Sequence, residues 1–226
     1  MYAAFVGPGD LVFDVGAHLG DRTVAFAGLG AQVIALEPQP ALLPVLRRVT
    51  RRYPGVAIQA SAVGAVAGTA ELLLSPANPT VSSLSRDFVA SIGQRNAGFR
   101  GVRWTDRVTV PVTTLDALIA EYGLPAFCKV DVEGYEEEVL AGLSQPLPAL
   151  SVEFLHGALR VAAQCVRRLE QLGTYRYNAV AGEGRRFLFR DWQSADAITA
   201  WLAAGETPPS GDIYAWSPSG RRRPAL

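Results

Sequence analysis

Apolar residues along this chain of 226 residues alternate between short continuous runs and patterns with a helical period. The first apolar run, at 11–15, ends on a turn that contains glycine, and a helical pattern at 21–29 and a second run at 32–36 follow it. Short apolar runs that alternate with helices are typical of β–α–β units. The pattern therefore predicts that the chain opens with such a unit.

The same alternation continues through most of the chain. The apolar runs predict strands at 11–15, 32–36, 56–63, 69–74, 108–112, 126–132, 149–154, 175–179, 186–190 and 212–216. The helical patterns predict helices at 21–29, 41–53, from Thr113 or Thr114 to about 122, 136–143, 158–172 and 194–202. We therefore predict an α/β fold with a doubly wound, mostly parallel sheet, helices on both faces and an antiparallel last strand. The runs at 175–179 and 186–190 further predict a hairpin.

One polar segment, at 75–107, interrupts this alternation. It carries several prolines and glycines and has no strong periodicity. A long segment of this kind inside a compact domain is typical of a lid or a disordered loop. We predict one domain over residues 1–226, with a lid insertion at 75–107 and a flexible, basic tail at 219–226.

Composition narrows the range of partners. Hydrophobic residues make up 49% of the chain, and 21 basic residues balance 21 acidic ones, so there is no general electrostatic reason to expect nucleic acid. No stretch reaches the roughly 18 apolar residues of a membrane span, and the first residues lack a signal-peptide pattern. Two cysteines are too few for a disulfide framework. We expect a cytoplasmic protein with a small-molecule partner and with neither a nucleic-acid nor a membrane partner.

The turn after the first run has the spacing Asp14-x-Gly16-x-x-x-Gly20, with His18 inside it. A carboxylate here would repel a pyrophosphate docked at the helix N-terminus and would favour a cationic ligand such as S-adenosylmethionine. Glu37 ends the second run, where a carboxylate can accept the ribose hydroxyls of a nucleoside. The alternatives are an N-cap or turn residue at Asp14, ordinary turn glycines, and a solvated strand end at Glu37.

A second group of ionisable residues, Lys129-Val-Asp131-Val-Glu133, lies at the end of the run at 126–132. Side chains alternate along a strand, so these three share one face. Charged groups at the end of a buried strand either satisfy one another, as in a structural Lys–Asp pair, or line a ligand cleft. Asp131 and Glu133 could also hold a divalent cation, but two carboxylates do not specify one, and no metal is indicated.

His156 follows the run at 149–154. Imidazole accepts a proton near neutral pH, so His156 joins Asp131 and Glu133 as a candidate general base. The alternative is an ordinary surface histidine.

Four stretches together resemble the FkbM family of S-adenosylmethionine-dependent methyltransferases: DVGAHLGD at 14–21, ALEP at 35–38, TLDAL at 114–118 and KVDVEGYEEEVLAG at 129–142. The resemblance covers about 12–154. Many methyltransferases share the first stretch, whereas the last is considerably more specific. The resemblance implies a class I methyltransferase fold, with a seven-stranded sheet and an antiparallel strand. It further implies methyl transfer from S-adenosylmethionine to a hydroxyl of a sugar or a secondary metabolite.

The resemblance also assigns site residues by position. The cofactor is expected at Asp14, Gly16, His18, Gly20, Glu37, Pro38, Ser61 and Ala62, with the last two near the adenine. Asp131 would lie beside the transferring methyl group. Ser82, Ser83 and Leu84 would lie on the acceptor side, together with Lys129. The short N-terminus and the long segment at 86–107 depart from the family pattern and leave the acceptor open.

Two other functions compete with this interpretation. A nicotinamide-dependent oxidoreductase would use a similar sheet, but it predicts a third glycine where this chain has Ala17-His18-Leu19. A non-catalytic scaffold that binds the cofactor within a biosynthetic complex is the other alternative.

Overall fold

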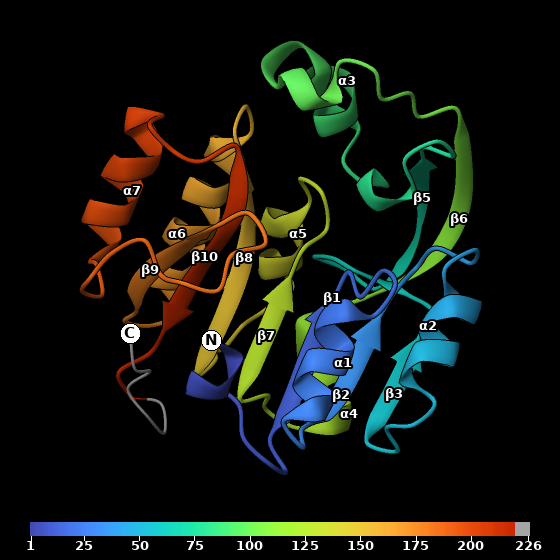
Figure 1. Ribbon diagram of the computed structural model, residues 1–226, viewed down its shortest axis with the longest axis horizontal. Coiled ribbons are helices and arrows are strands. Elements are labelled where there is room, and N and C mark those ends of the chain that lie inside the picture. Colours follow the sequence, from blue (N-terminus) through green and yellow to red (C-terminus); the bar gives the residue numbers. More distant parts are fainter. Residues whose placement is uncertain (220–226) are drawn as a thin grey trace.

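A seven-stranded sheet forms the centre of the computed structural model, which describes residues 1–219 (Figure 1). Its strand order is β3-β2-β1-β7-β8-β10-β9. The strands are β1 (Leu11–Val15), β2 (Gln32–Leu36), β3 (Val56–Gln59), β7 (Phe127–Val130), β8 (Ala149–Leu155), β9 (Arg176–Ala181) and β10 (Ser210–Trp216). The first five in spatial order are parallel, and β10 is antiparallel to both β8 and β9. The predicted α/β sheet with an inserted antiparallel C-terminal strand is confirmed.

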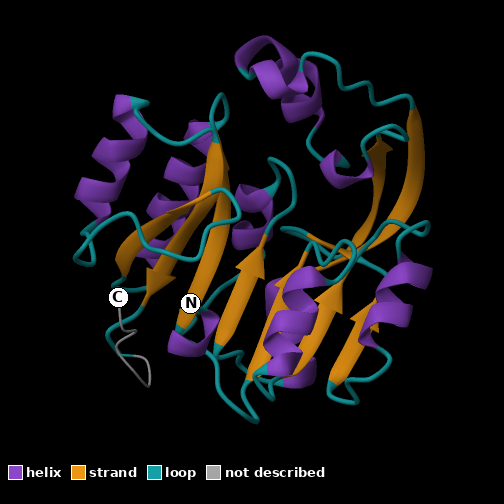
Figure 2. Ribbon diagram, in the orientation of Figure 1, coloured by secondary structure: helices purple, strands orange, loops and turns teal. Residues whose placement is uncertain are grey.

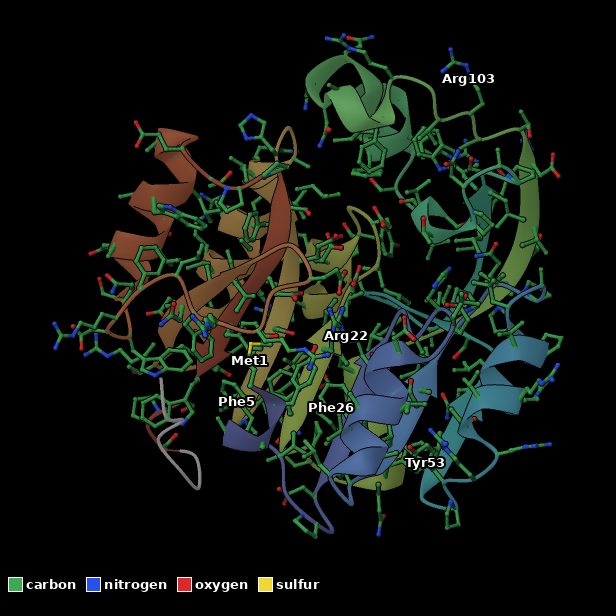
Figure 3. The ribbon with its side chains drawn as sticks, viewed as in Figure 1. Met1, Phe5, Arg22, Phe26, Tyr53 and Arg103 are labelled. Carbon is green, nitrogen blue, oxygen red and sulfur yellow. The ribbon has the colours of Figure 1, made fainter. Side chains whose placement is uncertain are left out.

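Helices cover both faces of this sheet (Figure 2). They are α1 (Asp21–Gly28), α2 (Leu43–Thr50), α4 (Leu115–Tyr122), α5 (Glu136–Ala141), α6 (Leu159–Leu172) and α7 (Ala195–Ala204). Helices α4 to α7 share one apolar cluster with Phe13 and Val130, which lie on the same face of the sheet. The opposite face is covered by α1 and the N-terminal turn, where Phe5 and Phe26 lie against Phe127 at ring-centroid distances of 5.2 and 5.8 Å (Figure 3). Side-chain alternation along the strands thus produces a core on each face.

A smaller sheet stands beside the carboxyl ends of the central strands (Figure 1). It contains β4 (Ala62–Val63), β5 (Gly68–Leu74) and β6 (Asp106–Thr113) in the order β4-β6-β5. The single strand predicted at 56–63 is therefore wrong, because the chain leaves one sheet after Gln59 and enters the other at Ala62. Gln59 pairs with Leu36, the last residue of β2, beyond which Pro38 has no amide hydrogen to continue the ladder.

The segment at 75–107 is ordered by its own helix, α3 (Arg86–Arg95), and by two short 3₁₀ turns, η2 (Pro79–Val81) and η3 (Ala97–Phe99). Ser85 caps α3 by accepting a hydrogen bond from the Phe88 amide at 3.2 Å. Phe88 and Ile92 then form a small buried cluster with Leu155. The segment is therefore not a structureless loop, and its role as a lid stays a prediction.

Near the C-terminus, the strand predicted at 186–190 is wrong. Only a single bridge joins Phe187 to Val180, and the Asn178 side chain bonds both the amide and the carbonyl of Phe189 in place of a regular ladder. The predicted tail, except residue 219, lies outside the described residues. Within residues 1–219, no helix has the length and apolar character that a bilayer crossing requires.

Candidate active site

The carboxyl ends of β1, β2, β7 and β8 border a cavity of about 240 Å³. The parallel register brings these ends to one edge, since Val15 lies opposite both Leu36 and Val130, and Val130 lies opposite Val152. The smaller sheet and residues 79–84 form the opposite wall. This is the edge at which open α/β sheets bind ligands.

The turn after β1 needs glycine at one position in particular. Gly16 has φ +85, and a Cβ added there would lie 1.8 Å from the carbonyl oxygen of Asp131. The turns after β1 and β7 thus touch backbone to backbone at the cavity wall. Gly20, also with positive φ, would place a Cβ 2.7 Å from Leu46 and so allows α1 to pack against α2. Gly16 and His18 line the cavity, and burial lowers the pKa of His18.

Asp14 lies below this turn, outside the cavity wall. It is 1% exposed, and its Oδ2 accepts a hydrogen bond from Thr23 Oγ1 at 2.5 Å. Its Oδ1 is buried without a hydrogen-bond partner among residues 1–219. Burial raises the pKa of Asp14, although nearby Lys129, its register partner on β7, lowers it. The Asp14 carboxylate therefore does not line the cavity, and its hydrogen bond joins β1 to α1.

Glu37 is held rigidly in the cavity wall. Its two carboxylate oxygens accept backbone hydrogen bonds from His18 at 2.8 Å and from Gln39 at 2.7 Å. Burial raises the pKa of Glu37 to about 7, and the two hydrogen bonds oppose that shift. Pro38, Ser61 and Ala62 also line the cavity, and Ser61 Oγ is a buried hydroxyl without a partner among residues 1–219.

These groups fit the nucleoside of an adenosyl cofactor. A fixed carboxylate with spare lone pairs suits ribose hydroxyls, and an unpartnered hydroxyl beside apolar residues suits the edge of a purine. The neighbouring Leu36 and Leu72 supply apolar wall for the base. The sequence assignment of this wall to the cofactor is thus chemically consistent with the geometry.

An acidic cluster forms the other end of the cavity. Asp131, Glu133 and Glu153 each place an oxygen within 4.8 Å of the others. Burial, reinforced by the neighbouring carboxylates, raises the pKa of Glu133 and of Glu153 well above the ordinary value. Such a set can share protons, and its oxygens are also the ligand type that hard cations prefer.

Lys129 lies behind this cluster rather than in the cavity. Its side chain is 3% exposed, and its Nζ bonds Asp131 Oδ2 at 2.5 Å. Burial lowers the pKa of Lys129, but the carboxylates of Asp131, Asp212 and Asp14 outweigh burial and raise it above its ordinary value. Lys129 is therefore placed to orient Asp131, and it does not reach the cavity to contact an acceptor.

The structure places His156 away from the cavity and Glu153 in it. His156 is exposed, with its Nδ1 3.5 Å from Thr207 Oγ1. Val130 and Val152 are paired, so the next residues on the two chains, Asp131 and Glu153, are neighbours at the same edge. Sequence reasoning missed Glu153, and the available signal was that it follows Val152 as Asp131 follows Val130.

The two predicted acceptor serines have different environments. Ser82 lines the cavity, and its Oγ donates a hydrogen bond to the Pro79 carbonyl at 3.2 Å. Ser83 is 1% exposed and donates to the Glu133 carbonyl at 2.7 Å. Ser83 therefore holds the turn after β7 against the segment above it.

Comparisons with known proteins identify the family of this chain. The model of the methyltransferase FkbM domain matches residues 14–193. The chain is 33% identical over 158 residues to the 31-O-demethyl-FK506 methyltransferase FkbM of Streptomyces tacrolimicus, with 60% of each protein covered. The match thus spans less than two thirds of that relative.

Solved structures resemble this fold at low sequence identity. The precorrin 8w decarboxylase of Methanobacterium thermoautotrophicum has a TM-score of 0.50 at 13% identity and covers 95% of this chain and 84% of its own. A SAM-dependent O-methyltransferase of Thermotoga maritima has a TM-score of 0.47 at 12% identity, and the match covers 99% of this chain and 65% of that protein. With the family match over most of its length, the chain belongs to the FkbM methyltransferase family and has a class I methyltransferase fold.

Proposed function

We propose that this protein transfers a methyl group from S-adenosylmethionine to a hydroxyl of a sugar or a secondary metabolite. The observation that carries the proposal is the acidic cluster of Asp131, Glu133 and Glu153 at one end of a cavity whose other end suits a nucleoside. The name of the Streptomyces relative, 31-O-demethyl-FK506 methyltransferase, supports an oxygen acceptor.

The two ends of the cavity have different tasks in this proposal. Glu37, with both oxygens anchored by backbone amides, would accept hydrogen bonds from the ribose. Gly16 lets the turn after β1 approach the Asp131 backbone, which brings the cofactor end next to the acidic cluster. Negative charge in that cluster would favour a positively charged sulfur over a pyrophosphate.

In the proposed reaction, the protein forms no covalent bond with the methyl group or the acceptor. S-adenosylmethionine, when bound, supplies a methyl group whose carbon bonds to the acceptor oxygen while the carbon–sulfur electron pair stays on sulfur. The hydroxyl proton passes to an ionised carboxylate of the cluster. Because burial raises the pKa of Glu133 and of Glu153, either group in its ionised form is a stronger base than an ordinary carboxylate. Lys129 holds Asp131 in place, and the cavity walls align the acceptor and exclude water.

The site also weighs against the two rival functions. A nicotinamide dinucleotide carries a pyrophosphate, which the buried Asp14 and the cluster would repel. A non-catalytic scaffold has no need for three carboxylates crowded at the strand ends, since crowding them costs stability. The same repulsion favours a neutral small-molecule acceptor over the phosphate backbone of a nucleic acid.

The test measures S-adenosylhomocysteine release over a panel of hydroxylated acceptors. We expect Asp131→Asn and Glu153→Gln to slow the transfer by about 10²-fold or more, the usual contribution of a general base. His156→Ala, at the exposed site outside the cavity, serves as the control and should stay within about threefold of wild type.

Two results would contradict the proposal. If Asp131→Asn, Glu133→Gln and Glu153→Gln each kept nearly the wild-type rate, the cluster would not be the base. If the protein bound S-adenosylhomocysteine tightly but methylated no hydroxyl in the panel, the scaffold function would be favoured.

A further inference from the structure

A second cavity, of about 460 Å³, lies between α3 and the first turns of α5 and α6. Figure 1 shows α3 above the carboxyl ends of the strands, set apart from the helices that cover the sheet. Leu84 and Tyr135 line this cavity and also the first one. The two cavities therefore adjoin at Leu84, which packs against Ala62 and Leu72 of the smaller sheet, and at Tyr135, two residues after Glu133.

The first cavity is too small to hold both reactants. Its volume of about 240 Å³ falls below the roughly 300–1,000 Å³ of typical small-molecule sites. Once an adenosyl cofactor fills the wall at Glu37, little more than the reacting group of an acceptor can fit beside Asp131. The rest of the acceptor has to extend out of this cavity, and the second cavity is the adjoining space.

The wall formed by α3 is firmly attached to the catalytic turns. A Cβ added at Gly134 would lie 2.4 Å from the Phe88 ring, so α3 packs directly on the turn after β7. Ser83 donates a hydrogen bond to the Glu133 carbonyl at 2.7 Å. Asn96 Nδ2 bonds the His156 carbonyl, after β8, at 2.8 Å. These contacts hold the α3 wall of the second cavity in a fixed position relative to the acidic cluster.

The lining of the second cavity is amphipathic and carries no net formal charge. Three arginines, at 86, 95 and 160, balance three acidic residues, at 87, 137 and 138. Two of these charges already have partners, since Arg86 pairs with Glu71 and Glu137 accepts a hydrogen bond from Gln164. Phe88, Ile92 and Val161 contribute apolar surface between them. Such a wall suits an uncharged molecule with both apolar and hydroxyl-bearing parts.

We propose that the second cavity binds the distal part of an extended, uncharged, amphipathic acceptor whose hydroxyl reaches the acidic cluster past Leu84 and Tyr135. This inference rests on the proposed function and narrows its substrate class. The acceptor is an uncharged molecule that carries both a hydroxyl-bearing part and an apolar part, and it is longer than a single sugar ring.

The test uses alkyl glucosides as probes of defined length. Calorimetry, with S-adenosylhomocysteine bound and below the critical micelle concentration, compares methyl β-D-glucoside, n-octyl β-D-glucoside and n-octyl phosphate. We expect the octyl glucoside to bind at least about tenfold more tightly than either of the other two, because apolar burial adds affinity and the acidic cluster opposes the phosphate.

A matched pair of variants on one helix locates the effect. Ser91→Trp fills the second cavity from α3, whereas Gln94→Trp adds the same bulk at an exposed position of α3 outside its lining. Ser91→Trp should reduce the preference for the octyl chain to within about threefold, and Gln94→Trp should keep it at about tenfold.

The outcomes separate this inference from the proposed function. If the wild-type protein does not bind S-adenosylhomocysteine, the proposed function itself is contradicted. Intact S-adenosylhomocysteine binding with no preference for the octyl chain would overturn the acceptor cavity alone. A preference that Ser91→Trp leaves unchanged would overturn it as well, because the chain would then bind elsewhere.

Discussion

Replacing Gly16 with alanine is expected to disrupt the cofactor end of the site, because this position combines two requirements for glycine. Its φ of +85 lies in the left-handed region, and an added Cβ would lie 1.8 Å from the Asp131 carbonyl oxygen and 2.9 Å from its carbon. Neither backbone atom can rotate away as the end of a side chain could. The turns after β1 and β7 would have to separate.

The chain offers a control that isolates the steric part of this cost. Gly9 has a nearly equal φ of +82, but a Cβ there meets no atom of residues 1–219 within 4 Å. Each Gly→Ala change should cost about 1–2 kcal/mol for the left-handed backbone. Overpacking adds about 1–3 kcal/mol, so Gly16→Ala should lower the free energy of unfolding by about 2 kcal/mol more than Gly9→Ala.

Two measurements test the pair. For a domain of this size, the additional 2 kcal/mol corresponds to a further decrease in Tm of about 4–8 °C. Calorimetry should show that Gly16→Ala weakens S-adenosylhomocysteine binding by more than about tenfold, a loss of over about 1.4 kcal/mol, with Gly9→Ala close to wild type. Equal losses of stability and unchanged binding in both variants would refute the steric contact between the two turns.

Two further predictions concern buried carboxylates. Glu37→Gln should weaken S-adenosylhomocysteine binding by about tenfold at pH 8, since an amide cannot accept both backbone hydrogen bonds that now hold the carboxylate. Because the pKa of Glu37 is about 7, wild-type affinity should fall from pH 8 to pH 6, and calorimetry that finds an equal fall in Glu37→Gln would contradict this role. Burial also raises the pKa of Glu136 to about 7. The folded state then binds more protons than the unfolded state, so its contribution to stability is present below about pH 4.5 and is lost as the pH rises to about 7. Urea denaturation at pH 5 and at pH 8 should show that the fall in the free energy of unfolding between these pH values is smaller in Glu136→Gln than in wild type, by up to about 3 kcal/mol. An equal fall in both proteins would contradict the assignment of this pH dependence to buried Glu136.

The acidic cluster illustrates how far motif reasoning extends. Strand alternation predicts that Lys129, Asp131 and Glu133 share one face of a strand at 126–132. The strand β7 instead ends at Val130, so Asp131 and Glu133 lie in the turn that follows, where Glu133 has φ +55. The structural Lys129–Asp131 pair, one of the two alternatives that the sequence left open, is present, and Asp131 and Glu133 also line the cavity. Sequence reasoning also selects His156 instead of Glu153 as a candidate base. The register between β7 and β8, which places Glu153 beside Asp131, cannot be read from the sequence.

The turn after β1 illustrates the same limit. The spacing of Asp14, Gly16 and Gly20 predicts a ligand-binding turn, and Gly16 does line the cavity. Asp14 is instead buried below it, bonded to Thr23 on α1. One residue of the motif, Gly16, thus lines the cavity, and another, Asp14, joins β1 to α1 outside it.

By itself, the sequence determined the alternation of strands and helices, the doubly wound α/β class and the strand ends where function concentrates. These features follow from local periodicity and turn chemistry, which depend on residues close together in the chain. Only the tertiary structure decided the break between β3 and β4, the helix within the segment at 75–107, the inclusion of Glu153 and the junction of two cavities at Leu84 and Tyr135. These depend on register and packing between segments far apart in sequence, and no local pattern encodes which distant side chain fills a given space.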